Sequence, residues 1–184
     1  QMSKLFYERF IKNEDITLFS PNNTPGLYEA FGMPEFDELY LKYEKDKSIP
    51  KSTIGAQELF MDLLKERAET GRIYIMNIDH CNTHSSFKDK VYMSNLCQEI
   101  TLPTTPIQHI DDKEGEIALC ILSAVNLGLL TDIDELEELC DLSVRALDEI
   151  IDYQEYPVEA AKVSTLARRS LGIGFIGLAH YLAK

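Results

Sequence analysis

The sequence lacks several features that would place it in a particular class of protein. No run of apolar residues reaches the roughly 18 that a membrane-spanning helix needs. The chain begins Gln-Met-Ser-Lys, with no apolar signal segment. Basic residues are few, 18 against 31 acidic ones, which gives a formal net charge of -13. Such a surface repels phosphate groups and argues against binding to nucleic acid or an anionic membrane. We therefore expect a cytoplasmic protein.

Cysteine is also scarce, and the sequence contains no internal repeat or low-complexity stretch. The four cysteines, Cys81, Cys97, Cys120 and Cys140, are widely and irregularly spaced, unlike a secreted disulfide framework. Apolar residues make up 45% of the chain and charged residues 27%, a balance typical of globular proteins. A length of 184 residues suits one domain or a piece of a larger one.

The pattern of apolar residues predicts a mainly helical first part, 1–71. Short amphipathic helices are expected near 5–11 and 36–43, separated by the turn-rich stretch 20–26. A third helix is expected over 56–68, with Gly71 as its C-cap. Its stripe of 3.6-residue period consists of Ala56, Leu59, Phe60, Leu63, Leu64 and Ala68.

Strands are predicted in the next part, 72–130, and a helix, strand and helix start in 131–184. The expected strands are 73–78, 96–102, 117–125 and 171–176, with a polar connection over 79–90. A long helix is expected after Thr131 and Asp132. Its apolar stripe consists of Ile133, Leu136, Leu139, Cys140, Val144, Leu147, Ile150 and Ile151. A short helix up to Lys184 has no closing cap, and the strands are few for the helices, so we expect a fragment whose sheet partners lie elsewhere.

The segment 94–100, Ser-Asn-Leu-Cys-Gln-Glu-Ile, concentrates reactive side chains. In a strand, Asn95, Cys97 and Glu99 would share one face, with Leu96 and Ile100 packed behind. An amide, a thiol and a carboxylate in a row suit a sugar as substrate. The amide can hold its hydroxyl groups, the carboxylate can take a proton from one of them, and the thiol can react by nucleophilic or one-electron chemistry. The plainer interpretation is that Cys97 is a packed core thiol. The nearby carboxylate disfavours a thiolate, so a neutral thiol that loses a hydrogen atom fits the chemistry better.

The same segment resembles the finger loop of class I ribonucleotide reductase large subunits, the aerobic, diphosphate-reducing enzymes. Further motifs of that family occur in order along nearly the whole chain. They are Thr-Gly-Arg-Ile-Tyr (70–74), Asp-His-Cys-Asn-Thr-His (79–84), Leu-Pro-Thr (102–104), Gly-Glu-Ile-Ala-Leu-Cys (115–120), Asn-Leu-Gly (126–128), Asp-Glu-Leu-Glu-Glu-Leu (134–139), Val-Arg-Ala-Leu-Asp (144–148), Asp-Tyr-Gln-Glu-Tyr-Pro (152–157) and Arg-Arg-Ser-Leu-Gly-Ile-Gly (168–174).

The resemblance implies a role for each matching residue. Cys97 corresponds to the cysteine that becomes a transient thiyl radical and abstracts the ribose 3′ hydrogen. Glu99 corresponds to the carboxylate that removes the 3′-hydroxyl proton, and Asn95 to the amide that holds the ribose hydroxyls. Leu96 is expected beside the substrate. Cys120 corresponds to one of two cysteines that supply reducing equivalents and end as a disulfide; Cys81 does not match the second, which the family carries upstream.

The resemblance also implies that residues 1–184 form a single segment of an α/β catalytic barrel of ten strands, with no cofactor or metal bound by the segment. The expected partners are the rest of the large subunit, a second large subunit and the radical-generating small subunit. The parent enzyme would need a di-metal tyrosyl radical on that small subunit, nucleotide effectors such as ATP, and a thioredoxin- or glutaredoxin-type reductant. The segment alone is expected to be inactive.

Two other functions stay open at this point. A non-catalytic interaction module, a relic of the reductase, would have no need of intact Asn95, Cys97, Glu99 and Cys120. A related radical enzyme with a glycyl radical or cobalamin initiator would share the barrel, although the flanking motifs favour the oxygen-dependent class.

Two local patterns have simpler explanations. Gly172–Gly177 fits the dinucleotide-binding glycine pattern but lacks the downstream acidic residue, so close packing of the backbone explains the glycines better. His80, Cys81 and His84 are too few for a structural zinc site and are expected in a polar turn near the active site.

Overall fold

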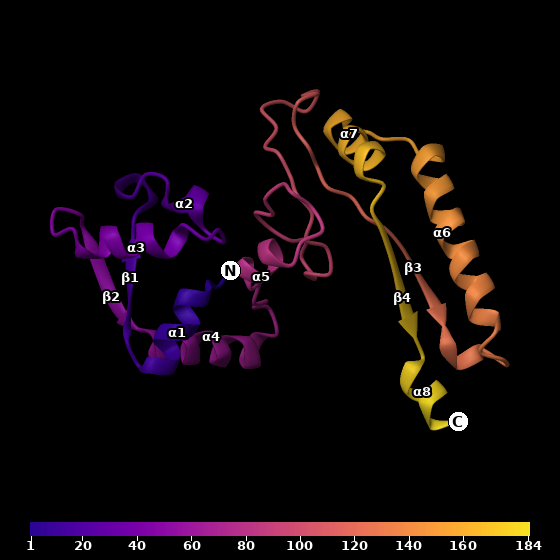
Figure 1. Ribbon diagram of the computed structural model, residues 1–184, viewed down its shortest axis with the longest axis horizontal. Helices are drawn as coiled ribbons and strands as arrows, with labels where there is room; N and C mark the ends of the chain where they lie inside the picture. Colours follow the sequence, from indigo (N-terminus) through magenta and orange to yellow (C-terminus); the bar gives the residue numbers. More distant parts are fainter. The chain divides into compact units, whose positions relative to one another are not determined.

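The computed structural model describes residues 1–184 and consists of two compact units, Gln1–Pro103 and Thr104–Lys184 (Figure 1). Both combine helices and strands, which confirms the α/β class expected from the sequence. The strands form two two-stranded sheets, and no closed barrel exists within these residues. None of the helices has both the length and the apolar character that crossing a bilayer requires.

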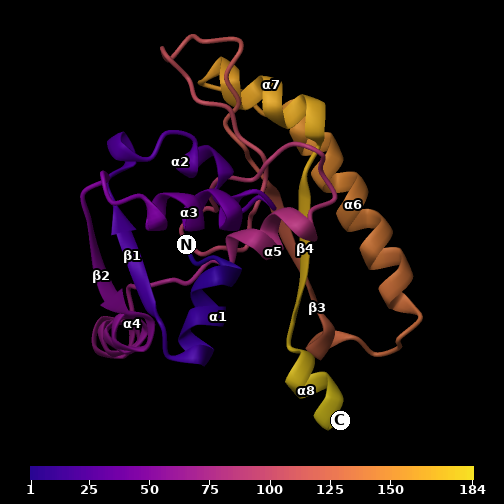
Figure 2. The same cartoon turned by 60° about the vertical axis from the view of Figure 1, so that its left-hand side comes forward.

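The first unit packs its helices around a short antiparallel sheet (Figure 2). Its elements are α1 (Lys4–Lys12), β1 (Asp15–Phe19), a 3-10 helix (Pro21–Asn23), α2 (Leu27–Ala30), α3 (Phe36–Lys45), β2 (Lys51–Gly55), α4 (Ala56–Thr70) and α5 (Ile78–Thr83). The helices expected near 5–11, 36–43 and 56–68 are therefore confirmed. As predicted, Gly71 ends α4 in the left-handed conformation, with its N–H donating to the Arg67 carbonyl.

The sheet of β1 and β2 was not predicted. The two strands pair from Asp15 opposite Gly55 to Phe19 opposite Lys51. Ile16 is buried in a cluster with Phe6 of α1 and Ala56 of α4. Each strand has only five residues, and α2 and α3 intervene in the chain. No local turn signal therefore links the strands, and their sequences were included in the helical part.

The predicted strand 73–78 is wrong. Residues 72–76 are extended without a strand partner, and a single parallel bridge joins Met2 to Asn77. The helix α5 begins at Ile78, inside the predicted strand, and continues into the predicted polar connection. The apolar pattern was real, since Met76 and Ile78 are buried with Val91. Burial alone does not make a strand, because the backbone also needs a neighbour to pair with.

The second unit is built on a parallel pair of strands with α6 packed along them (Figure 1). Its elements are β3 (Ile121–Asn126), a 3-10 helix (Leu127–Leu129), α6 (Glu135–Tyr153), α7 (Glu159–Arg168), β4 (Leu171–Ile176) and α8 (Leu178–Ala183). The strand predicted at 171–176 is confirmed. The strand predicted at 117–125 begins only at Ile121, where pairing with β4 starts.

The apolar stripe of α6 is only partly buried. Leu147 and Ile151 lie in the core, whereas Leu139, Val144 and Ile150 are exposed. Of the β3 side chains, Val125 alone is buried, and it packs with Leu127 and Leu130. A parallel strand pair normally has both faces covered, so much of the apolar surface encoded here has no cover within this unit.

A network of polar groups joins three elements of the first unit. The Arg9 guanidinium of α1 binds both carboxylate oxygens of Glu44 of α3 at 2.6 Å. Glu44 Oε1 also accepts from the Thr17 hydroxyl of β1 at 2.6 Å, and the Tyr40 hydroxyl donates to the Thr17 carbonyl at 2.8 Å. The hydrogen bonds from Arg9 hold the pKa of Glu44 below its usual range. The network therefore fixes α1, β1 and α3 to one another.

We predict that Glu44→Gln lowers the free energy of unfolding by about 2 kcal/mol at neutral pH, because a mostly buried guanidinium loses its charged partner. A carboxylate with a depressed pKa stabilises the fold above its unfolded pKa of about 4.3, and the effect disappears as the pH falls through the folded pKa. The difference between variant and wild type should therefore be constant above about pH 6 and shrink in acid.

Urea denaturation of the chain at several pH values measures this difference. Glu38→Gln is the matched control, because Glu38 is on the same helix and exposed; it should change stability little. A Glu44→Gln penalty that persisted unchanged in acid would contradict the assignment to this ion pair.

Candidate active site

The reactive residues of the segment 94–100 lie on a loop. No strand passes through them, so the predicted strand over 96–102 is wrong. Gln98 has a φ of 65°, in the left-handed region, and its N–H donates to the Asn95 carbonyl at 3.2 Å. This turn reverses the chain between Asn95 and Ile100. The side chains of Asn95, Cys97 and Glu99 are thus brought onto one turn instead of alternating along a strand.

Asn95 holds the loop closed through its backbone and its side chain. Its N–H donates to the Ile100 carbonyl at 3.3 Å, and its side-chain Oδ1 accepts from the Ile100 N–H at 3.0 Å. The Ser94 hydroxyl donates to the Asn95 carbonyl at 2.9 Å. Since the amide oxygen is engaged by the backbone, the Nδ2 group is the part of Asn95 that offers hydrogen bonds to a ligand.

The stem of the loop is attached to α5 by Asn82. The Asn82 amide accepts from the Val91 N–H at 2.8 Å and donates to the Val91 carbonyl at 3.1 Å, which imitates the pairing of a neighbouring strand. Val91 is fully buried against Met76 and Ile78. At the other end of the loop, Pro103 is fully buried. Both ends are anchored, so the loop projects from a fixed base.

The reactive side chains project into solvent. Cys97 and Glu99 are exposed and Asn95 is half-buried. Leu96, expected to pack behind the thiol, has 79% of its surface exposed, so that expectation is wrong for the residues described. Ile100 is half-buried. A thiol and a carboxylate in the open are accessible to a substrate, but within this unit nothing surrounds them.

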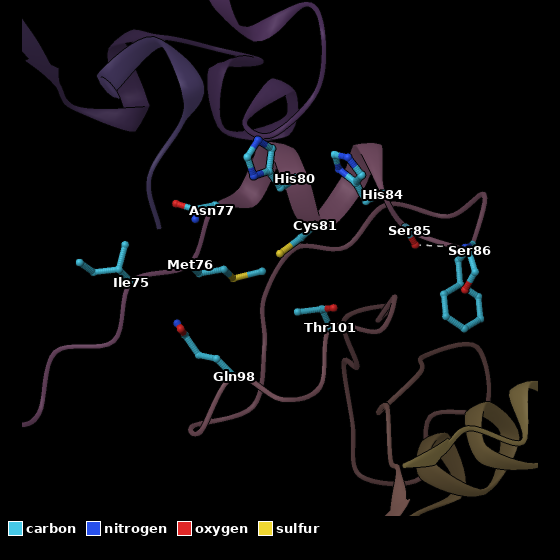
Figure 3. A pocket seen from close by; sticks show the side chains of 11 residues that line it. Ile75, Met76, Asn77, His80, Cys81, His84, Ser85, Ser86, Gln98 and Thr101 are labelled. Atoms are coloured by element: carbon cyan, nitrogen blue, oxygen red, sulfur yellow. Dashed lines mark hydrogen bonds between the residues drawn. The ribbon is translucent and has the colours of Figure 1, made fainter. Parts of the chain in front are cut away.

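A cavity of about 480 Å³ lies beside the loop, within the first unit. Gln98 and Thr101 of the loop and Cys81, His80 and His84 of α5 are among the residues that line it. Figure 3 shows the Cys81 side chain pointing from the helix toward the segment that carries Gln98 and Thr101. Burial raises the pKa of the Cys81 thiol, so Cys81 is a protonated thiol at neutral pH. The two histidine rings lie edge to face, with centroids 5.5 Å apart.

Cys120 belongs to the second unit, where it directly precedes β3. It is half-buried, and its Sγ lies 3.9 Å from the Ile121 carbonyl oxygen. Cys81, Cys97 and Cys140 are free thiols. The loop of the first unit thus carries Asn95, Leu96, Cys97 and Glu99, whereas Cys120 lies in the second unit, directly before β3.

Sequence reasoning missed two residues that shape these sites. Asn82 was noted only as part of a family motif, although an asparagine within a short helix is a poor helix former and suggests a side-chain role. Gln98 was treated as a spacer between Cys97 and Glu99. Its left-handed φ has no signal in the sequence, because glycine or asparagine is the usual residue there.

Comparisons with known proteins agree with these observations. The family described as "Ribonucleotide reductase, barrel domain" matches residues 1–184. The chain is 62% identical over 189 residues to ribonucleoside-diphosphate reductase subunit alpha of Haemophilus influenzae, and 58% identical over 189 residues to ribonucleoside-diphosphate reductase 1 subunit alpha of Escherichia coli. It is 44% identical over 191 residues to subunit alpha of Enterobacteria phage T4. Each match covers 100% of this chain and 25% of the relative, so the chain spans about a quarter of the length of these curated relatives.

We predict that Asn95→Leu releases the Ile100 amide from the loop. Loss of one ordinary hydrogen bond of about 1 kcal/mol should raise the exchange rate of the Ile100 N–H about fivefold, measured by NMR hydrogen exchange. Asn95→Asp is the matched control, because it keeps a side-chain oxygen at the same place and should keep the protection. Equal exchange rates in Asn95→Leu and wild type would refute the role given to Oδ1.

Proposed function

Because the chain belongs to the ribonucleotide reductase barrel-domain family, we propose that it serves as the segment of a ribonucleoside-diphosphate reductase large subunit that carries the radical cysteine. The segment acts only when the rest of the large subunit is present. The observation that supports the proposal is the turn at Gln98, which keeps Asn95, Cys97 and Glu99 in one short loop and leaves Cys97 and Glu99 exposed to solvent.

In the proposed reaction, the Cys97 thiyl radical takes the 3′ hydrogen of the ribose and Glu99 takes the proton of the 3′ hydroxyl. Asn95 donates from Nδ2 to a ribose hydroxyl, and Leu96 lies beside the sugar. Cys120 and a second cysteine outside this chain give two electrons and two protons. Overall, a ribonucleoside diphosphate and two thiols become a deoxyribonucleoside diphosphate, a disulfide and water.

The exposure of these groups supports the need for the remaining three quarters of the subunit. A radical intermediate must be shielded from water and from side reactions, whereas Cys97 and Glu99 are open to solvent in this unit. The exposed apolar residues of β3 and α6 also support the need for the rest of the subunit. We propose that the rest of the subunit supplies this cover, together with the second redox cysteine.

The other proposed partners follow from the chemistry. A small subunit with a di-metal tyrosyl radical would supply the oxidising equivalent for Cys97, and a thioredoxin- or glutaredoxin-type protein would reduce the disulfide again. Two large subunits would pair, with nucleotides such as ATP as effectors. Work in the cytoplasm suits a reaction that needs reduced thiols, and the net charge of -13 argues against nucleic acid as a ligand.

We predict that Cys97→Ser abolishes reduction of a ribonucleoside diphosphate, because a hydroxyl cannot replace the thiol as a hydrogen-atom carrier. The chain is tagged in its source and purified with whatever accompanies it. Product is then assayed with added small subunit and dithiol. Cys140→Ser is the matched control: Cys140 is a half-buried thiol on α6 and its substitution should leave turnover near wild type.

Full activity in Cys97→Ser would contradict the assignment of Cys97 as the radical cysteine. A biological function that survived Cys97→Ser would favour the alternative, a non-catalytic interaction module. Absence of activity in the wild type, with no other piece of large subunit co-purifying, would mean that these roles describe only the parent enzyme.

A further inference from the structure

Gly172 lies against the thiol of Cys120. In the parallel pair, Leu122 of β3 stands opposite Gly172 of β4, and the Ile121 N–H donates to the Ser170 carbonyl at 3.2 Å. Cys120 is therefore held at the point where the two strands first meet. A Cβ built on Gly172 would lie 3.1 Å from Cys120 Sγ and would overlap Leu122 Cδ2.

The reason for a glycine at 172 is space. Its φ is not in the left-handed region that favours glycine, unlike those of Gly71 and Gly177. Any residue could adopt this strand backbone, and glycine within a strand is otherwise unfavourable. The only demand that the structure places on position 172 is that no side chain occupies the volume beside Cys120 and Leu122.

The two neighbours differ in how easily they can move. Leu122 Cδ2 is the end of a flexible side chain that is 54% exposed, so it can rotate away at small cost. Cys120 Sγ is one bond from Cβ on a half-buried residue at the edge of the pairing. At 3.1 Å it has to give way by a few tenths of an ångström, which requires a rotation about χ1 or a shift of the backbone. An added methyl group would therefore overlap Leu122 more, but Leu122 can rotate into solvent, whereas the smaller displacement of the thiol falls on a half-buried residue.

We propose that Gly172 is a positioning residue for the Cys120 thiol, which it keeps in the rotamer that forms the redox disulfide. The proposal rests on the proposed function, in which Cys120 bonds to a second cysteine. A disulfide tolerates little error, with an S–S distance of about 2.05 Å and a preferred dihedral near 90°. A displaced Sγ would slow bond formation without altering how the substrate binds.

Gly174 supplies the matched control. It lies on the same strand, two residues further, and therefore points to the same side of the sheet. A Cβ there would meet only the Ser123 carbonyl oxygen, at 4.0 Å, an ordinary contact. Gly172→Ala and Gly174→Ala thus make the same chemical change in the same strand, and only the first reaches the thiol.

The test is made on the assembled enzyme: the chain, the rest of its large subunit and the small subunit. Pre-reduced enzyme without external dithiol is given a ribonucleoside diphosphate, and the disulfide containing Cys120 is followed by mass spectrometry. Gly172→Ala should slow its formation about tenfold or more, with the apparent KM for substrate unchanged. Gly174→Ala should stay within about twofold of wild type. Equal rates in the two variants would overturn the proposal.

A second measurement does not depend on catalysis. The rate at which iodoacetamide alkylates Cys120 should differ from wild type in Gly172→Ala and equal it in Gly174→Ala. If the wild type reduces no nucleotide, the proposed function has failed, yet this comparison still decides whether Gly172 places the thiol. Identical alkylation of Cys120 in all three proteins would refute the positioning role.

Two further variants identify the atom involved. Adding Leu122→Ala to Gly172→Ala should leave the defect in place; full recovery would mean that the methyl group acts through Leu122, and the proposal would be wrong. If Gly172→Ala does not assemble, Gly172→Ala with Cys120→Ala decides. Restored assembly would show that the added methyl group overlaps the Cys120 sulfur. Continued failure to assemble would refute the positioning role of Gly172.

Discussion

Every buried backbone N–H and carbonyl needs a hydrogen-bond partner, and this requirement determines which parts of the chain become strands. Residues 121–126 and 171–176 find each other and form a parallel pair. Residues 72–76 have an equally apolar pattern but form no strand, and their only backbone pairing before α5 begins at Ile78 is with Met2, at Met76 and Asn77. The difference between the two cases lies in the availability of a partner strand.

Where a neighbouring strand is missing, asparagine side chains make some of the hydrogen bonds to the backbone that such a strand would make. Asn82 makes two hydrogen bonds to the backbone of Val91, and Asn95 closes the loop onto Ile100. A carboxamide has an acceptor and donors arranged like those of a peptide group, so it can satisfy a backbone that no strand reaches. The two asparagines thereby give a definite shape to a region with little regular structure.

The sequence predicts the fold class and most helices because helices depend on local pattern and caps, as α1, α4 and α6 illustrate. It fails for β1 and β2, which are joined only through tertiary contacts, and for the strand at 73–78, whose apolar residues are buried without pairing.

The residue types of the candidate site were predicted from the motif around Cys97, yet their geometry was not. Neither the left-handed φ of Gln98 nor the hydrogen bond from the Ile100 N–H to the Asn95 side chain can be read from the amino-acid sequence. The glycine at 172 was attributed to close packing of the backbone, whereas the atoms nearest to it belong to the side chains of Leu122 and Cys120.

The hydrogen bonds that shape the loop around Cys97 all lie between Ser94 and Ile100. The turn itself is therefore held by hydrogen bonds within seven consecutive residues. The rest of the unit contributes the two ends of the loop, through the hydrogen bonds between Asn82 and Val91 and the burial of Pro103. Substitutions outside residues 94–100 that leave these two ends in place therefore remove none of the hydrogen bonds that shape the turn around the Cys97 thiol.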